Sequence, residues 1–204
     1  MTKNYNINKY KALVAKYGSY SSWAIWNHEK AIDTTVIDQN FAQLHSKFVL
    51  LGLNVSRTLN SRLWSNFHDN THARKLKYAC NDTILRGSYM TDIFKDLAEP
   101  TATNIQNMLS DKLVRENVDM FNQEMKDVKL NEDSQFIIFG NLAREYFSKY
   151  FKQDYKNNII YQKHYSARGT DKEWVKGFWN KLNITQDFES IIKKYKPQNW
   201  HNTI

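Results

Sequence analysis

Three polar side chains of the sequence stand where they could do chemistry together. Asn54 directly follows an apolar run, Asp92 lies near the end of a second, and His164 closes a third. An amide, a carboxylate and an imidazole can orient a water, exchange hydrogen bonds with a polar ligand and stabilise a developing anion. Their use depends on whether the three runs are strands that end at one place.

The sequence predicts four strands, and their order along the chain is Phe48–Leu53, Ser88–Phe94, Phe136–Gly140 and Asn158–His164. The first and third are nearly continuous apolar runs. Strands that are buried on both faces, as in a parallel sheet covered by helices, have this composition.

Helical periodicity fills the intervals between these strands. Helices are predicted over 110–128, 141–152 and 171–182, and near 7–17, 36–46, 72–80 and 186–195. Ser110 and Asp171 are the predicted N-caps of two of them. The alternation predicts an α/β fold: a single domain over 1–204, with three α/β/α layers and a central, mainly parallel four-stranded sheet.

The carboxyl edge of such a sheet is where ligands bind, near the switch in strand order. We therefore expect Asn54, Asp92 and His164 to converge there, with Arg57 and Arg168 nearby. We expect Gly52 to allow a close backbone approach at the same edge.

Composition limits the classes of partner. The 204 residues carry a formal net charge of +8, and 14% are aromatic. A basic chain suits a polyanion, and aromatic side chains beside positive charge suit base stacking. No apolar run is long enough to span a bilayer and no signal peptide is evident, so we expect no membrane partner and a cytoplasmic or nuclear location.

We predict neither a metal nor a cofactor. His68 and His72 are four residues apart but have no third ligand near them in the sequence. The single cysteine, Cys80, is expected to be a buried packing residue. The stretch after the first strand does not have the glycine spacing of a phosphate-binding loop.

Four motifs, in chain order, resemble the uracil-DNA glycosylase superfamily. GLNVS at 52–56 is similar to its first motif, YMTDIFKD at 89–96 to its second strand, and FIIFGNLAREYF at 136–147 to its third strand and following helix. HYSARGTDKEW at 164–174 resembles its second catalytic motif. The motif forms are nearest to the single-strand-selective monofunctional and mismatch-specific branches, and the resemblance spans roughly residues 45–180.

The resemblance implies a monofunctional DNA glycosylase that hydrolyses the N-glycosidic bond of a base flipped out of DNA. The resemblance implies that Asn54 positions the attacking water and that His164 donates a hydrogen bond to the departing base. The base-binding residues that it implies are Asp92, Phe67 and Tyr89. Phosphate contacts are assigned to Ser56, Arg57, Ser166 and Arg168, with Arg168 also filling the space left by the flipped base.

Each of these residues also has a structural interpretation. Asn54 and Asp92 could each cap a following helix or turn, and His164 could be a structural histidine. Phe67 could be a core residue, with Trp64 the rival for base stacking. Arg168 could be a solvated loop residue.

The sequence departs from the family at two prolines, which are replaced by Val55 and Tyr165. Proline stiffens a loop, so both loops are expected to be looser than in the family. An alternative function is therefore a weak or inactive glycosylase-fold protein that binds nucleic acid or a nucleotide. A nucleoside hydrolase needs a sugar-binding carboxylate cluster, for which we find no pattern.

Overall fold

Five strands form one sheet in the order β1-β3-β2-β4-β5. Their bounds are β1 Ser22–Trp23, β2 His45–Asn54, β3 Ser88–Phe94, β4 Gln135–Phe139 and β5 Ile159–Gln162. Strands β2 to β5 run parallel, and β1 pairs antiparallel with β3. The structure is a computed structural model that describes residues 5–27, 29–55, 62–68, 73–95, 97–155 and 158–195.

The four predicted strands are all present, but the predicted number of strands was wrong. The additional strand, β1, is only two residues long and pairs through Ser22 with Met90 and through Trp23 with Tyr89. Two residues are too short for an alternating pattern to be seen. This strand forms because the chain returns to the exposed edge of β3.

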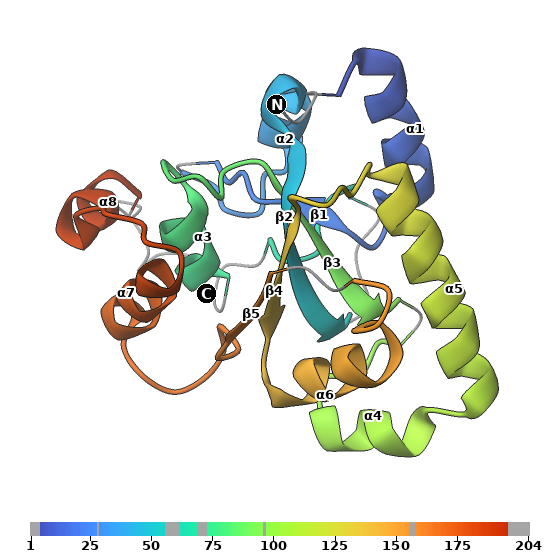
Figure 1. Cartoon of the computed structure of the whole chain (residues 1–204). Coiled ribbons are helices and arrows are strands. Elements are labelled where there is room, and N and C mark those ends of the chain that lie inside the picture. The colour runs from blue at the N-terminus through green and yellow to red at the C-terminus, as the bar shows by residue number, and fades with distance from the viewer. Residues whose placement is uncertain are drawn as a thin grey trace.

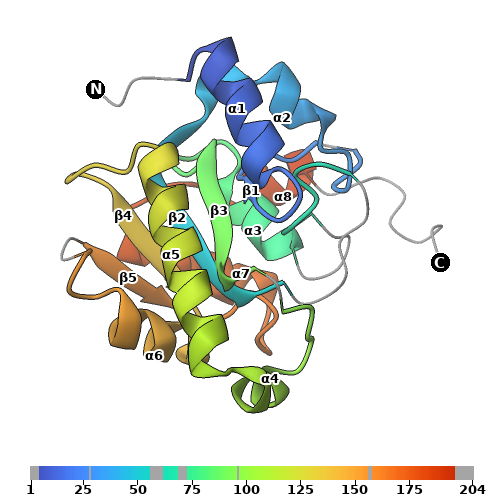
Figure 2. The same ribbon diagram turned by 90° about the vertical axis from the view of Figure 1, so that its right-hand side faces the viewer.

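The helices cover both faces of the sheet, so the three-layer α/β/α architecture is confirmed (Figure 1). The helices are α1 Ile7–Tyr17, α2 Thr35–Gln39, α3 Arg74–Cys80, α4 Ala102–Met108, α5 Asp111–Asp127, α6 Asn141–Tyr150, α7 Asp171–Lys181 and α8 Phe188–Tyr195. Helices α1, α5 and α6 pack on one face, and α3, α7 and α8 on the other. Figure 2 looks onto the first face and shows α5 in front of the sheet.

One helix prediction and one predicted cap were wrong, and one helix was missed. The helix expected near 36–46 ends at Gln39, a 3₁₀ turn follows over Phe41–Gln43, and His45 already begins β2. Helix α4 was not predicted. The side chain that caps α7 belongs to Thr170 rather than Asp171, since Thr170 and Glu173 form a capping box. Ser110 caps α5, as predicted.

The switch in strand order lies at β2, the central strand. The chain passes from β2 to β3 on one side and later to β4 and β5 on the other. The arrows of β2 and β3 end at the bottom of Figure 1, so their carboxyl ends share one edge. The fold therefore has the switch in strand order beside which ligands of open α/β sheets bind.

A buried ion pair joins β3 to α5. The Lys95 ammonium lies 2.8 Å from a carboxylate oxygen of Glu124, and both side chains are completely buried. Glu124 also accepts a hydrogen bond from the Tyr89 hydroxyl at 2.6 Å. Lys95 donates to the backbone carbonyl of Asp92 and to the Thr91 hydroxyl. Each buried charge is thus compensated by close partners.

We expect Glu124→Ala to lower the free energy of unfolding by about 3–5 kcal/mol, because it leaves the Lys95 ammonium buried without a counter-charge. Replacing both residues with methionine should recover much of this loss. Urea denaturation measures both effects. Glu116→Ala is the matched control, because Glu116 lies on the same helix in an exposed pair with Lys112. Equal losses for Glu116→Ala and Glu124→Ala would contradict this account of the buried pair.

Candidate functional site

Gly52 and Asp92 are paired neighbours at the carboxyl edge of the sheet, one on β2 and the other on β3. A Cβ atom at Gly52 would lie 2.1 Å from Asp92 Oδ1 and 3.5 Å from an edge carbon of the Phe67 ring. Only glycine therefore allows the Asp92 carboxyl group to lie across β2. The close approach expected at Gly52 is present.

The Asp92 carboxyl group is held in a buried polar position, with only 4% of the residue exposed. Its Oδ2 accepts a hydrogen bond of 2.7 Å from Asn66 Nδ2, which also donates to the Tyr20 carbonyl. Burial raises the pKa of Asp92 from 3.8 to about 7, although the hydrogen bond from Asn66 and the charge of Lys95 act in the opposite direction. Near neutral pH this group is therefore poised between carboxylic acid and carboxylate.

Phe67 places an aromatic ring beside this carboxyl group. Its backbone has φ +64°, a left-handed conformation that non-glycine residues seldom adopt. Asn66 Oδ1 supports this turn by accepting a hydrogen bond from the Phe67 amide. The ring is buried and lies 6.3 Å, between centroids, from that of Tyr165. The short segment 62–68 therefore delivers an amide and an aromatic ring to the sheet edge.

His164 and Tyr165 reach the same place from the end of β5. The two rings stack with centroids 4.2 Å apart, and the Tyr165 ring also contacts Phe139 at the end of β4. A Cβ at Gly140 would lie 3.5 Å from the Cβ of His164. The ends of β4 and β5 are thus in contact through these side chains.

The neutral form of His164 has a defined tautomer. Its Nδ1 accepts a hydrogen bond from the Ser166 amide at 3.2 Å and lies 2.7 Å from the Ser166 hydroxyl. A nitrogen that accepts from an amide carries no proton, so the proton is on Nε2. The imidazole is half-buried and can donate a hydrogen bond through Nε2.

Asn54, at the end of β2, has an oriented side-chain amide. Its Nδ2 donates to the backbone carbonyls of Leu97 at 2.9 Å and Glu99 at 2.8 Å, and also to that of Val55. Carbonyls require a donor, so these contacts identify the nitrogen and leave Oδ1 as an acceptor. Among the residues described, Oδ1 receives no hydrogen bond. Asn54 thus ties the end of β2 to the segment that contains Leu97 and Glu99, and the residues of a helix that it could cap lie outside the described part of the chain.

Several predicted site residues lie elsewhere. Tyr89 is fully buried on the α5 face, bonded to Glu124 and Ser21, so it cannot reach a base at the site. Trp64 is also buried and donates to the Tyr10 hydroxyl, which excludes it as the stacking residue. Asp92 lies within β3 and caps no turn.

Two of the four predicted phosphate-binding residues, Ser166 and Arg168, lie in the described part of the chain. Ser56 and Arg57 lie outside the described residues, as does His72. Ser166 is exposed and orients His164. Arg168 is exposed and lines a separate cavity beside α7. The partners Asn66 and Tyr165 were not predicted, since no local pattern marks a side chain that meets its partner across the fold.

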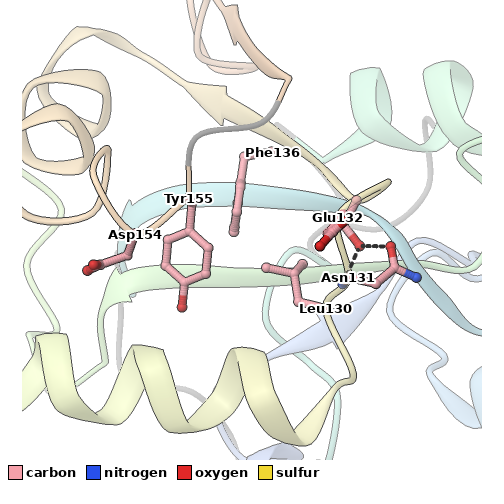
Figure 3. A pocket seen from close by; sticks show the side chains of 7 residues that line it. Leu130, Asn131, Glu132, Phe136, Asp154 and Tyr155 are labelled. Atoms are coloured by element: carbon pink, nitrogen blue, oxygen red, sulfur yellow. Dashed lines mark hydrogen bonds between the residues drawn. The ribbon is translucent and has the colours of Figure 1, made fainter.

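A cavity of about 270 Å³ lies at the opposite, amino edge of the sheet. Figure 3 shows the rings of Phe136 and Tyr155 between the carboxylates of Glu132 and Asp154. None of the predicted site residues lines it. This cavity is therefore distinct from the group around Asp92 and His164.

Cys80 is completely buried in the core, as predicted. No cluster of three or more His, Cys, Asp or Glu side chains that could hold a metal ion occurs in the part of the chain that the structure describes. No helix among those residues has both the length and the apolar character needed to cross a membrane.

Comparisons of the chain with protein-family models, with curated proteins and with solved structures found no match.

The raised pKa of Asp92 has a direct consequence for stability. The folded chain binds this proton more tightly than the unfolded chain. The free energy of unfolding of the wild type, relative to Asp92→Asn, should therefore fall as pH rises from 3.8 to about 7 and then level off. The total change is roughly 4 kcal/mol.

Urea denaturation of both proteins across this pH range measures the effect. Asp133→Asn is the control, since Asp133 is an exposed carboxylate far along the chain from the site. A pH-independent difference between wild type and Asp92→Asn would show that Asp92 ionises normally.

Proposed function

We propose that this protein is a DNA glycosylase that hydrolyses the N-glycosidic bond of a flipped uracil-like or modified base. The observation that carries the proposal is a chain of contacts at the carboxyl edge, in which Phe67 lies beside the Asp92 carboxyl group and is connected to His164 through the ring of Tyr165. A carboxyl group, an aromatic ring and an imidazole donor are the side chains needed to read, stack and release a base.

Asp92 can form hydrogen bonds with the polar edge of a uracil-like base when its carboxyl group is protonated. In many members of the resembled family an asparagine stands here. A protonated carboxyl group offers one donor and one acceptor, as the side chain of asparagine does. The raised pKa keeps a share of Asp92 in that form near neutral pH. The ionised form would instead prefer a base that presents an amino group or ring N–H.

The reaction needs a water and an anion-stabilising donor. Water adds to the anomeric carbon of the sugar, the bond to the base breaks, and the base leaves with the bonding electrons before it gains a proton. Asn54 Oδ1 can accept a hydrogen bond from that water, since its amide nitrogen is already engaged. His164 Nε2–H can donate to the base oxygen on which negative charge develops.

A second candidate function, binding without chemistry, is favoured by Tyr165. Its ring lies between Phe67 and Phe139, with centroids 6.3 Å and 5.8 Å away, where an incoming base would stack on Phe67. A base must therefore displace this ring or stack against it. A protein that never admits a base would retain the same arrangement.

The test is base release from oligonucleotides that carry uracil, in single and double strands, followed by alkaline cleavage of the abasic site. We expect single-turnover excision by the wild type, and a loss of roughly a hundredfold or more in the rate constant for His164→Ala, because one anion-stabilising donor is removed. Asn54→Ala should also be slower, since the water loses its acceptor.

Asn107→Ala is the matched control, because Asn107 is an exposed asparagine on α4. Unfolding midpoints of all variants separate lost chemistry from lost folding. Excision that is unaffected by both site substitutions would overturn the mechanism. Oligonucleotide binding without any excision by the wild type would select the second candidate.

A further inference from the structure

A cavity of about 350 Å³ lies between the end of β5 and helix α7. Its lining includes three cationic side chains, which are Lys163, Arg168 and Lys181, and one anionic side chain, Glu173. The volume is within the range of small-ligand sites. The cavity therefore combines room for a ligand with an excess of positive charge.

The positive charge in this cavity is only partly compensated, because three cationic side chains face the single carboxylate of Glu173. Among the described residues, none of the three cations forms an ion pair. The Lys181 ammonium donates instead to the Tyr161 carbonyl at 2.6 Å and to Gln162 Oε1 at 2.8 Å. An ammonium has three donors, so one donor of Lys181 is left for a ligand.

The one acidic residue in the lining is already committed. Glu173 accepts a hydrogen bond from the Thr170 amide at 3.1 Å as part of the capping box of α7. Its carboxylate is held at the start of the helix and keeps its negative charge, so the two lysines and the arginine leave the cavity with a formal excess of positive charge. Burial is the main cause of the lowered pKa of Lys181, and the positive charge of Lys163 lowers it further.

Gly177 gives the cavity its space. It lies in the interior of α7, where glycine is less favourable than alanine. A Cβ at this position would meet no atom within 4 Å, so no packing contact explains the glycine. The absence of a side chain instead keeps one wall of the cavity open.

We propose that this cavity binds a phosphate group, held by Lys163, Lys181 and Arg168. Arginine and lysine are the usual partners of phosphate, and arginine can contact two of its oxygens. Lys163 immediately precedes His164, so the cavity lies on the loop that carries the candidate site. The source of the phosphate is a DNA strand, which rests on the proposed function, or a free nucleotide.

Calorimetric titration of the full chain in phosphate-free buffer tests this. The probes are inorganic phosphate, thymidine 5′-monophosphate, thymidine, and a single-stranded oligonucleotide without uracil. We expect thymidine 5′-monophosphate to bind and thymidine not to bind. Lys181→Gln should weaken binding of the phosphate probes by roughly tenfold, because one charge-assisted contact is lost.

Two further variants separate charge from space. Gly177→Phe leaves the charge unchanged but fills the cavity, and it should abolish binding. Lys176→Gln is the matched control, because Lys176 is an exposed lysine on α7 that does not line the cavity. Its binding should equal that of the wild type. Unfolding midpoints verify that each variant is folded.

The outcomes are distinct from those of the excision test, since the titration measures binding of the phosphate group and not release of a base. Binding of the oligonucleotide that depends on Lys181 identifies a strand phosphate. Binding of the mononucleotide alone identifies a free nucleotide, and both outcomes support the phosphate site. Failure of every phosphate probe to bind, or equal weakening by Lys176→Gln and Lys181→Gln, would overturn the proposal.

Discussion

The buried ion pair between Lys95 and Glu124 holds β3 in place against α5. Buried charges are tolerated only where close partners compensate them, and here Tyr89 and the Asp92 carbonyl supply the additional hydrogen bonds. Successive side chains of a strand point to opposite faces, so fixing Tyr89 toward α5 directs the Asp92 carboxyl group to the other face, across Gly52. The candidate site and the buried pair therefore depend on the same strand.

The same alternation explains which site residues could be predicted from the sequence. The apolar runs fixed where β2 to β5 end, and this was enough to bring Asp92 and His164 to one edge. Tyr89 and Asp92 are three residues apart in β3, so their side chains cannot face the same ligand. The motif places Tyr89 near Asp92 in the sequence, but the alternation of side chains along a strand places the two on opposite faces of the sheet.

Other features could not be predicted from local pattern. The left-handed turn at Phe67 contains no glycine that would have predicted it. Asn66 supports the turn through the Phe67 amide and is itself bonded to the Asp92 carboxyl group of β3. Strand β1 exists only through its pairing with β3. By contrast, the sequence pattern does mark Gly177 as unusual, because a glycine inside an amphipathic helix usually has a packing or functional reason. That reason, an open cavity wall, required the fold.

Side-chain contacts restrict the chain near Val55 and at Tyr165, where the resembled family has prolines. Proline restricts a loop through its ring, whereas Tyr165 is restricted by stacking on His164 and by contact with Phe67 and Phe139. The end of β2 is held in a similar way, because Asn54 bonds to the carbonyls of Leu97 and Glu99. Contacts of this kind can be exchanged for contacts with a ligand, but a proline ring cannot. The rigidity of this site is therefore conditional on whether the Tyr165 ring keeps its contacts with Phe67 and Phe139.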